Sequence, residues 1–486
     1  MNFRIIITSA SVLLFTATAW PAEDKVQQLQ LQLKQLQADF EKTRRLQQQQ
    51  IDELTQKLAA LSGAPPRAAI PAPAKNDEQQ KLERELAAAS GPAVPGLKTE
   101  LGLAPSATGT KAGSSYMNLS FGTLIDAGWS SVTDPSSQLQ LGDHDPSKRG
   151  FLLRNAEISL DGAIDPYFKG FANIVLKLDK NNATDIELEE SYLQSTALPA
   201  NLQLKAGQYF ASFGRQNAQH PHAWSFVDQP LILGRAFGPD GLRSIGAQLS
   251  WLAPTPFYTE LFLSVLDGQG GTAFSFRNPG DPDAAGINRY AGRATSDRTL
   301  RGAQDLLFVP RLASSFELSD TQTLLAGVSA AIGPNDTGPH RRTEVYGADF
   351  FWKWKPADAS QGFPYLTWQT EALYRRFEAA GDPLVPLPAE VLRDYGYYSQ
   401  LVWGFGPRWN AGLRVDYVSG NDALFDPADP YRGKRYRFSP ELTFLPSEFS
   451  KIRLQYNYDH GDLFGAAHSV WMRLEFGLGA HAAHKY

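Results

Sequence analysis

The sequence predicts an all-β transmembrane barrel of about 16 antiparallel strands, preceded by an α-helical coiled coil. From Tyr116 onward, segments alternate apolar with polar side chains, and KIRLQYNYDH at 451–460 is the clearest of them. The connections between these segments are alternately short and long. Aromatic residues make up 12% of the chain, yet apolar residues make up only 42%. An apolar face turned to lipid and a polar face turned to water explain this composition.

Residues 1–22 have the pattern of a cleaved secretory signal. A short start with Arg4 precedes an apolar run that is too short to span a membrane as a helix, and Ala17-Thr18-Ala19 or Ala22 offers a cleavage site. A charged stretch follows directly, which favours export over a membrane anchor. No later segment is a continuous apolar run of about 18 residues, so we expect no transmembrane helix.

Residues 23–62 predict a periplasmic coiled coil. Apolar residues from Val26 to Phe40 and from Ile51 to Leu61 follow three-four spacing, and the interval between the two runs matches a stutter. So narrow an apolar stripe favours self-association, although a single helix lying on another surface would have the same pattern. Residues 63–115 are a Pro/Ala/Gly-rich linker with a short helix, and no chemistry is visible there.

Residues 116–486 predict the barrel itself. Short turns such as 164–166 alternate with long connections such as 131–149 and 268–304, which is the asymmetry of outer-membrane barrels. An even strand count places both barrel ends on the short-turn, periplasmic rim, beside the coiled coil. The expected strands begin near Tyr116, Gly150, Pro166, Thr184, Asn201, Leu242, Phe257, Asp305, Gln322, Arg342, Phe363, Val391, Pro407, Arg435, Phe449 and Ala467.

Composition and missing motifs exclude several functions. The chain has no cysteine, which excludes disulfides, thiolate metal sites and cysteine nucleophiles. Its net charge of −5 provides no basic field for nucleic acid. No Gly-rich phosphate loop or Gly-x-Ser-x-Gly motif occurs. Glu189 and Glu190, adjacent on one strand, should point to opposite faces. We therefore expect no enzyme and no cofactor.

Three stretches carry a family resemblance: GFLLRNAEISLDGAIDPYFKGFANIVLKLD at 150–179, LQLKAGQYFASFGRQN at 202–217 and VWMRLEF at 470–476. Together with the signal and the coiled coil, they make the chain similar to Gram-negative outer-membrane porins, and most similar to the phosphate-selective porin O/P family. The resemblance implies a homotrimer in the bacterial outer membrane that conducts ions or small hydrophilic solutes by passive diffusion. Its partners would be membrane lipid and those solutes.

Two features depart from that family. Its phosphate-selective members rely on clustered lysines and an arginine ladder, whereas lysine is sparse here, so phosphate selectivity is not carried over. The last strand also does not end the chain at Phe476, and the final aromatic is Tyr486. Either Phe476 or Tyr486 could be the terminal aromatic residue that the outer-membrane insertion machinery recognises. Sugar-specific porins can also carry N-terminal coiled coils, which keeps a sugar channel open.

Charged side chains that face the lumen set ion selection in a channel. The alternation turns several charges inward from neighbouring C-terminal strands, and we expect a basic wall with interspersed acids that favours anions weakly. Alternatively, these charges pair with one another and only keep the interior hydrated. The expected pore-lining charges are Arg414, Asp416, Arg435, Arg437, Glu441, Lys451, Arg453, Asp459, Arg473 and Glu475.

Residues 212–241 form the third outward loop, after 131–149 and the short connection 180–183, and in sixteen-stranded porins that loop commonly folds into the lumen as a constriction. A water-filled lumen can satisfy the backbone of such a loop, which lipid could not. Trp224, Phe226 and Phe237 are available to anchor it to the wall. The expected constriction residues are Arg215, Asn217, His220, His222, Asp228 and Arg235.

The pair His220 and His222 is also a candidate zinc or copper site. Such a site needs more ligands; Asp228, or His481 and His484 of the tail, could supply them, although the tail belongs on the opposite rim. A polar loop without metal has the same pattern. Another function remains open, in which the coiled coil tethers the envelope and the barrel is only an anchor. A TonB-dependent receptor is disfavoured, because it needs about 22 strands.

Overall fold

The computed structural model describes residues 108–112, 115–139, 142–163, 165–179, 182–296, 299–382, 384–421, 433–462 and 464–479. The predicted signal, the coiled coil, nearly all of the linker and the tail with His481, His484 and Tyr486 lie outside the described residues. Those predictions therefore stay predictions.

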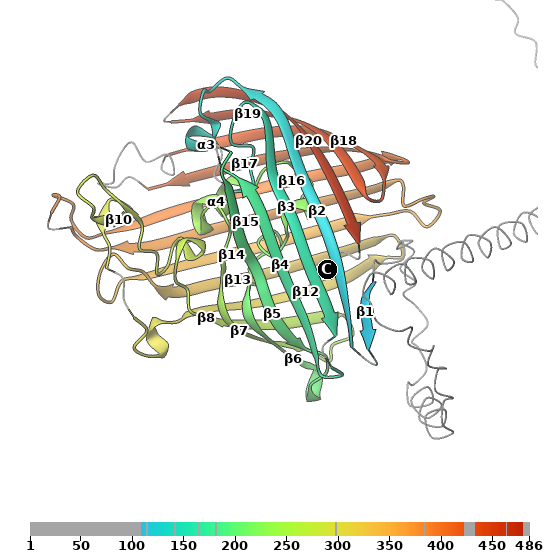
Figure 1. Ribbon diagram of the computed structural model, residues 1–486, viewed down its shortest axis with the longest axis horizontal. Helices are drawn as coiled ribbons and strands as arrows, with labels where there is room; N and C mark the ends of the chain where they lie inside the picture. The colour runs from blue at the N-terminus through green and yellow to red at the C-terminus, as the bar shows by residue number, and fades with distance from the viewer. Residues whose placement is uncertain are drawn as a thin grey trace, which may run out of the picture. The chain divides into compact units, whose positions relative to one another are not determined.

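The described chain forms a closed antiparallel barrel (Figure 1). The main sheet has 17 strands; β1 (Thr108–Ala112) is an addition that pairs with β2, and the other sixteen make the wall. Pairing of β20 with β2 and of β8 with β12 closes the ring. The wall strands are β2 (Ser115–Ser130), β3 (Gly150–Ala163), β4 (Phe168–Leu178), β5 (Thr184–Ser195), β6 (Leu202–Phe210), β7 (Arg243–Leu252), β8 (Tyr258–Leu266), β12 (Leu307–Ser319), β13 (Gln322–Pro334), β14 (Arg342–Trp354), β15 (Tyr365–Ala379), β16 (Glu390–Gly406), β17 (Trp409–Gly420), β18 (Arg435–Ser447), β19 (Ser450–Gly461) and β20 (Gly465–Gly479).

Smaller elements lie in the connections. They are the helices α3 (Pro135–Gln138) and α4 (Leu231–Phe237), the 3-10 turns η1 (Pro199–Asn201), η2 (Pro221–Ala223), η3 (Gly271–Ala273) and η4 (Ala303–Asp305), and a small sheet of β9 (Asp281–Pro282), β10 (Asn288–Tyr290) and β11 (Arg293–Ala294). Among the described residues, no helix is long and apolar enough to cross a membrane.

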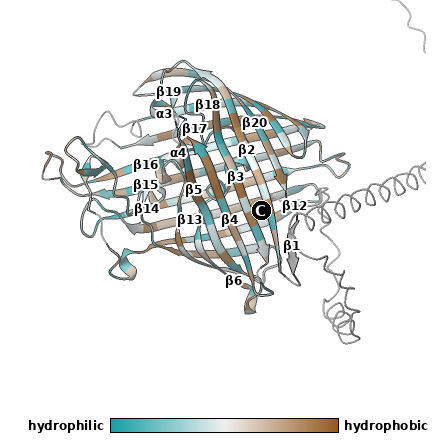
Figure 2. Ribbon diagram, in the orientation of Figure 1, coloured by the Kyte–Doolittle hydropathy of each residue, from teal (hydrophilic) through white to brown (hydrophobic). Residues whose placement is uncertain are grey.

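The predicted strand count and antiparallel order of the barrel are confirmed. Each expected strand start lies within two residues of an observed one, and the long connections fall where the sequence places them. The alternation that predicts the strands also sorts their side chains. In β19, Ile452 and Leu454 point outward and are 37% and 51% exposed, whereas Arg453 and Gln455 point inward and are buried. Figure 2 shows hydrophobic and hydrophilic residues interleaved along the strands.

The barrel interior contains an apolar core, which corrects the expectation that apolar side chains only coat the outside. Leu231, Leu233 and Phe237 of α4 pack against inward-facing residues of the wall, including Leu373 and Tyr398. Apolar residues of β7, β12, β13 and β17 join the same cluster. The helix α4 therefore lies inside the barrel (Figure 1), held by burial of apolar surface as in a soluble protein.

Candidate functional site

The connection between β6 and β7, residues 211–242, enters the barrel, and we call it the inner loop. Its two ends are tied together at a neck. The Ala211 amide donates to the Leu242 carbonyl at 2.9 Å. The Asn217 side chain accepts a hydrogen bond from the Leu242 amide at 2.7 Å and donates to the Ala211 carbonyl at 2.9 Å. The inner loop is thus a closed unit that projects from the β6–β7 edge.

Beyond the neck, the inner loop reaches the inner face of β15. The backbone amides of Arg215 and Gln216 donate to one carboxylate oxygen of Glu371, at 3.1 and 2.7 Å. Gly214 precedes them with φ of 59°, and a Cβ at this position would collide with Glu371. Glycine is favoured here by both the left-handed backbone and the close approach. The guanidinium of Arg215 donates to Gln369 at 3.1 Å.

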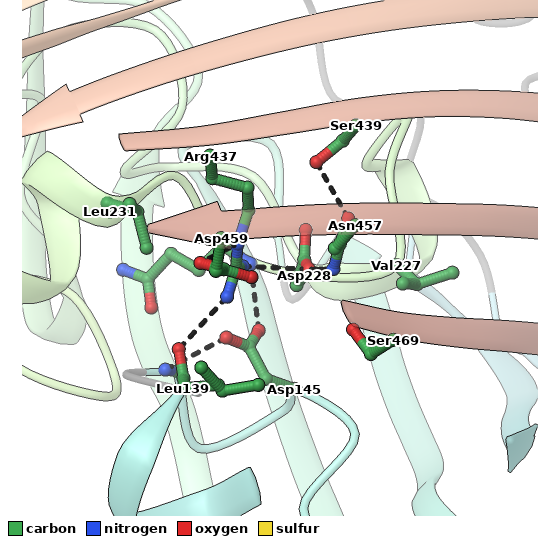
Figure 3. A network of polar contacts seen from close by, with 12 residues as sticks. Leu139, Asp145, Val227, Asp228, Leu231, Arg437, Ser439, Asn457, Asp459 and Ser469 are labelled. Carbon is green, nitrogen blue, oxygen red and sulfur yellow. Dashed lines mark hydrogen bonds and ion pairs between the residues drawn. The ribbon is translucent and has the colours of Figure 1, made fainter. Parts of the chain in front are cut away.

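Asp228 is the second anchor of the inner loop and contacts β17, β18 and β19 at once. Its carboxylate forms ion pairs with Arg414 and Arg437 and accepts hydrogen bonds from Gln455 and Asn457. Figure 3 shows Arg437 and Asn457 beside Asp228. Burial by itself would raise the pKa of Asp228, but Arg437 and Arg414 outweigh burial and hold it at about 2. Because this folded pKa lies below that of a free aspartate, the pairs stabilise the loop at neutral pH and weaken only as pH falls toward about 2.

The first long connection, residues 131–149, packs against the inner loop and the same wall, and we call it the first loop. The Gln229 amide donates to Asp145 at 2.7 Å. The Leu139 carbonyl accepts hydrogen bonds from Arg435 and Arg437, and Figure 3 shows Leu139 and Asp145 beside Arg437. Burial, followed by the nearby charge of Asp228, raises the pKa of Asp145 to about 6.

The predicted basic wall faces the interior, but loops and acids cover most of it. Arg414, Arg437 and Arg473 are each 1% exposed. This burial favours the alternative given in the sequence analysis, in which the charges of this wall pair with one another. Of the expected lining charges, Lys451 keeps a partly exposed side chain. The ion pairs on this wall are Arg414–Asp416, Arg435–Asp459, Arg437–Asp459, Arg453–Glu441, Lys451–Glu475 and Arg473–Asp126.

The two loop histidines, His220 and His222, contact different carboxylates and do not face a common metal position. His220 lies between Glu189 and Glu190, with nitrogen–oxygen distances of 2.7 and 2.8 Å, and His222 contacts Glu157 at 3.0 Å. Burial disfavours the imidazolium of His220, yet the two glutamates outweigh it and raise its pKa well above the ordinary value.

This arrangement corrects the expectation that Glu189 and Glu190 point to opposite faces. The β4–β5 register shifts at this point, so that Asn173 pairs with Glu190 and Ile174 pairs with Leu188. The shift leaves Glu189 as the extra residue of a β-bulge, and both carboxylates turn inward. They are 1% and 6% exposed.

The remaining predicted loop residue, Arg235, lies on α4. It approaches Asp394 at 3.6 Å and donates to the Gly433 carbonyl at 3.1 Å. The aromatic residues Trp224, Phe226 and Phe237 are buried. The inner loop therefore joins its polar residues to the wall through hydrogen bonds and ion pairs, and its apolar residues through packing.

Below the inner loop, on the side of β2–β8 and β12, lies a cavity of about 650 Å³. Its lining contains the bases Lys169, Lys205, Arg215 and Arg311 and the acids Asp161, Glu190 and Glu260, interleaved with the aromatic side chains Phe171, Tyr192, Tyr258 and Phe262. The inner loop contributes Ser212, Gly214, Arg215, Ala218 and Gln219 to the lining, and β6 contributes Phe210.

Lys205 is one of three bases of this cavity, with Lys169 and Arg311, that the sequence analysis did not single out. Its ammonium lies over the rings of Tyr192 and Tyr209, at 4.6 and 5.2 Å from their centroids. Among the described residues, no carboxylate lies within ion-pair distance of it. The alternation in LQLKAGQYF could have found it, because Lys205 follows the outward-facing Leu204.

The chain has a relative of comparable length in sequence. An uncharacterized protein of Aquifex aeolicus (strain VF5) is 32% identical over 358 residues, which cover 70% of this chain and 71% of the relative. The chain belongs to the family of this Aquifex protein. No established family model matches the chain. The resemblance of the chain to the phosphate-selective porin O/P family therefore stays a prediction.

Solved structures with similar folds are distant from this family in sequence. The outer membrane channel DcaP of Acinetobacter baumannii is 13% identical, with 76% of this chain and 99% of that chain covered and a TM-score of 0.49. An anion-selective porin from Comamonas acidovorans is 8% identical, with coverage of 75% and 100% and a TM-score of 0.45. Pseudomonas putida OprB is 11% identical, with coverage of 75% and 94% and a TM-score of 0.43.

Proposed function

We propose that this protein is an outer-membrane porin through which small hydrophilic solutes diffuse passively. The observation that carries the proposal is the pairing of an apolar exterior with a charged and polar cavity inside one closed ring. Large hydrophobic side chains such as Leu454, Leu474 and Phe476 are exposed on the outside, a surface that suits hydrocarbon and not water. A solute inside the barrel would meet the cavity beneath the inner loop.

The cavity lining supports a weak preference for anions, but from different residues than the sequence suggests. The arginines on β17, β18 and β20 are buried and ion-paired. Lys205 and Lys169 instead line the cavity, and the ammonium of Lys205 lies over an aromatic ring, with Glu190 and Glu260 beyond ion-pair distance in the same lining. We infer that these lysines, and not the arginine wall, set the sign of the selectivity. The rings beside them also suit stacking against a sugar, so sugars belong among the solutes to test.

A second candidate function is an envelope tether in which the barrel serves only as an anchor. The observation that favours it is the interior core, since Leu231, Leu233 and Phe237 of α4 are buried in one cluster with residues of the wall. Under this function the barrel needs no solute path, and the predicted coiled coil of residues 23–62 would carry the activity.

Planar-bilayer conductance of the purified, folded protein separates the two functions. A porin gives stepwise openings. In a KCl gradient, its reversal potential should lie on the side of the chloride equilibrium potential. When phosphate and sugars are titrated, any of these solutes that binds in the cavity should block the current. A folded, heat-modifiable barrel without conductance would exclude the porin and leave the tether. Cross-linking in outer-membrane vesicles tests the predicted homotrimer in the same preparation.

A further inference from the structure

Four side chains from three segments meet at one point beside the inner loop. Asp143 and His144 belong to the first loop, Asp240 lies near the end of the inner loop, and Glu189 is the bulge residue of β5. Ligand atoms of Asp143, His144 and Asp240 all lie within 4.8 Å of one another. The Asp143 amide donates to the Pro239 carbonyl at 3.0 Å, which holds the two loops together at this point.

His144 is oriented so that one ring nitrogen faces the acids. Its Nδ1 lies 2.8 Å from the side-chain oxygen of Asn155, whose amide group in turn donates to Glu157 at 2.8 Å. An amide oxygen can only accept, so Nδ1 carries the proton. In the neutral ring Nε2 then has a lone pair, and it lies 3.5 Å from Glu189 Oε1 and 3.8 Å from Asp240 Oδ1.

These two distances are too long for good hydrogen bonds but suit ligands of a shared cation. Tetrahedral zinc with bonds of about 2.0–2.1 Å places its ligand atoms roughly 3.3 Å apart. Asp143 is a less suitable ligand, because Lys177 already forms an ion pair with it and with Glu187.

The oxygen atoms around this point are buried and lack hydrogen bonds. Glu189 Oε1, Asp240 Oδ1 and Gln229 Oε1 are each inaccessible and have no hydrogen-bond partner. Glu189 is 1% exposed and Gln229 is 6% exposed. All three residues and His144 line one small cavity of about 20 Å³, which is enough for a single water or ion. Buried polar atoms are nearly always hydrogen-bonded, whereas two of these oxygens have only the longer contacts with His144 Nε2.

We propose that this cavity binds one divalent transition-metal ion of the zinc type, through His144 Nε2 and the carboxylates of Glu189 and Asp240 that face it. One imidazole nitrogen with carboxylate oxygens is a donor set that suits zinc or a neighbouring first-row ion better than magnesium. The ion would join the first loop, the inner loop and β5 into one unit. It would be a structural clamp, distinct from the sequence-predicted pair His220 and His222.

The test is calorimetric titration of the metal-free, folded full chain with zinc chloride, followed by calcium and magnesium chloride. We expect one zinc ion per chain, bound more tightly than either alkaline-earth ion. His144→Gln should weaken zinc binding by at least about tenfold, since loss of a group that orients or binds the metal typically costs 10–100-fold. Asp240→Asn, which keeps the side-chain volume, should do the same. Heat-modifiable migration of each variant shows that the barrel has folded.

Two control variants locate the ion. His340→Gln alters an exposed histidine of the β13–β14 connection that does not line this cavity, and the double variant His481→Ala/His484→Ala removes the tail histidines; both should bind zinc as the unaltered protein does. The proposal is overturned if the folded protein takes up no zinc at micromolar concentration, which would leave the cluster as plain ion pairs. It is also overturned if either control loses binding while His144→Gln keeps it, or if calcium binds more tightly than zinc.

Discussion

Asp228 of the inner loop and Arg437 of β18 form an ion pair with a nitrogen–oxygen distance of 2.9 Å, and neither side chain is exposed to solvent. A buried pair of this kind adds little net stability compared with apolar residues, but removing one partner leaves an uncompensated charge. Arg414 makes the consequence larger, because it shares the same carboxylate. The pair therefore fixes where the inner loop docks against β17 and β18.

Asp228→Asn should release the inner loop from this wall. The substitution leaves Arg414 and Arg437 without their shared charge, and we expect a loss of about 3–5 kcal/mol in loop docking. Single-channel current noise should increase, and protease should cut within 211–242 faster. Asp320→Asn, in an exposed turn, should leave both measurements unchanged. Unaltered noise in Asp228→Asn would mean that this anchor does not hold the loop.

Gly214→Ala should weaken the contact with β15. The left-handed backbone costs a residue with a Cβ about 1–2 kcal/mol, and here the added carbon also displaces Glu371 from the amides of Arg215 and Gln216. Gly286→Ala is the matched control, because Gly286 has φ of 76° in open space. The two variants should differ in protease sensitivity of the inner loop, and equal sensitivity would show that Glu371 is not needed.

Phe237→Ala should empty part of the interior core. Phe237 is completely buried and packs edge-to-face against Phe213 at 4.8 Å between ring centroids. Truncation of a buried phenylalanine costs about 3–5 kcal/mol, and α4 should then detach without unfolding the barrel. Phe151→Ala removes a ring that is 82% exposed and serves as the control. Hydrogen exchange of residues 231–237 measures the outcome, which would be contradicted by protection equal to that of the unaltered protein.

Lys205→Glu should move the reversal potential in a KCl gradient toward cation selectivity. Its ammonium lines the cavity and forms no ion pair among the described residues, although Glu190 and Glu260 act on it from the same lining, so reversing its charge changes the field that a passing ion meets. Lys148→Glu, at the surface of the first loop, should have a smaller effect. If the Lys148 variant shifts the potential more, selection takes place at the rim rather than beneath the inner loop.

The strands could be predicted because membrane barrels require a strict alternation along each strand. Arg453 and Leu454 must face opposite sides whatever the neighbouring strands are, so a local pattern is sufficient. Glu189 and Glu190 show the limit of this argument. A one-residue bulge reverses the alternation locally, and its cause is the pairing with β4, which no local pattern contains.

The site could be predicted only as a region. The order of connections indicates which loop enters a barrel, and the composition of 212–241 suits that position. The partners of the loop could not be predicted, because Asp228 and Arg437 are 209 residues apart in the chain. The same holds for His144 and Asp240, since an isolated Asp-His-Asp sequence in a loop has no metal-ligand spacing of its own. The apolar side of α4 was visible in LILGRAF, but its burial inside the barrel follows from tertiary packing.

The neck of the inner loop has a consequence for the order of assembly. Asn217 and Leu242 are separated by only 25 residues, so the neck can close as soon as β6 and β7 pair, at small entropic cost. The anchors on β15, β17, β18 and β19 are made later in synthesis than the loop that they hold. The anchors Arg215–Glu371 and Asp228–Arg437 join residues 156 and 209 positions apart, so closing them costs more entropy than closing the neck, and the loop can take its shape before the wall around it is complete.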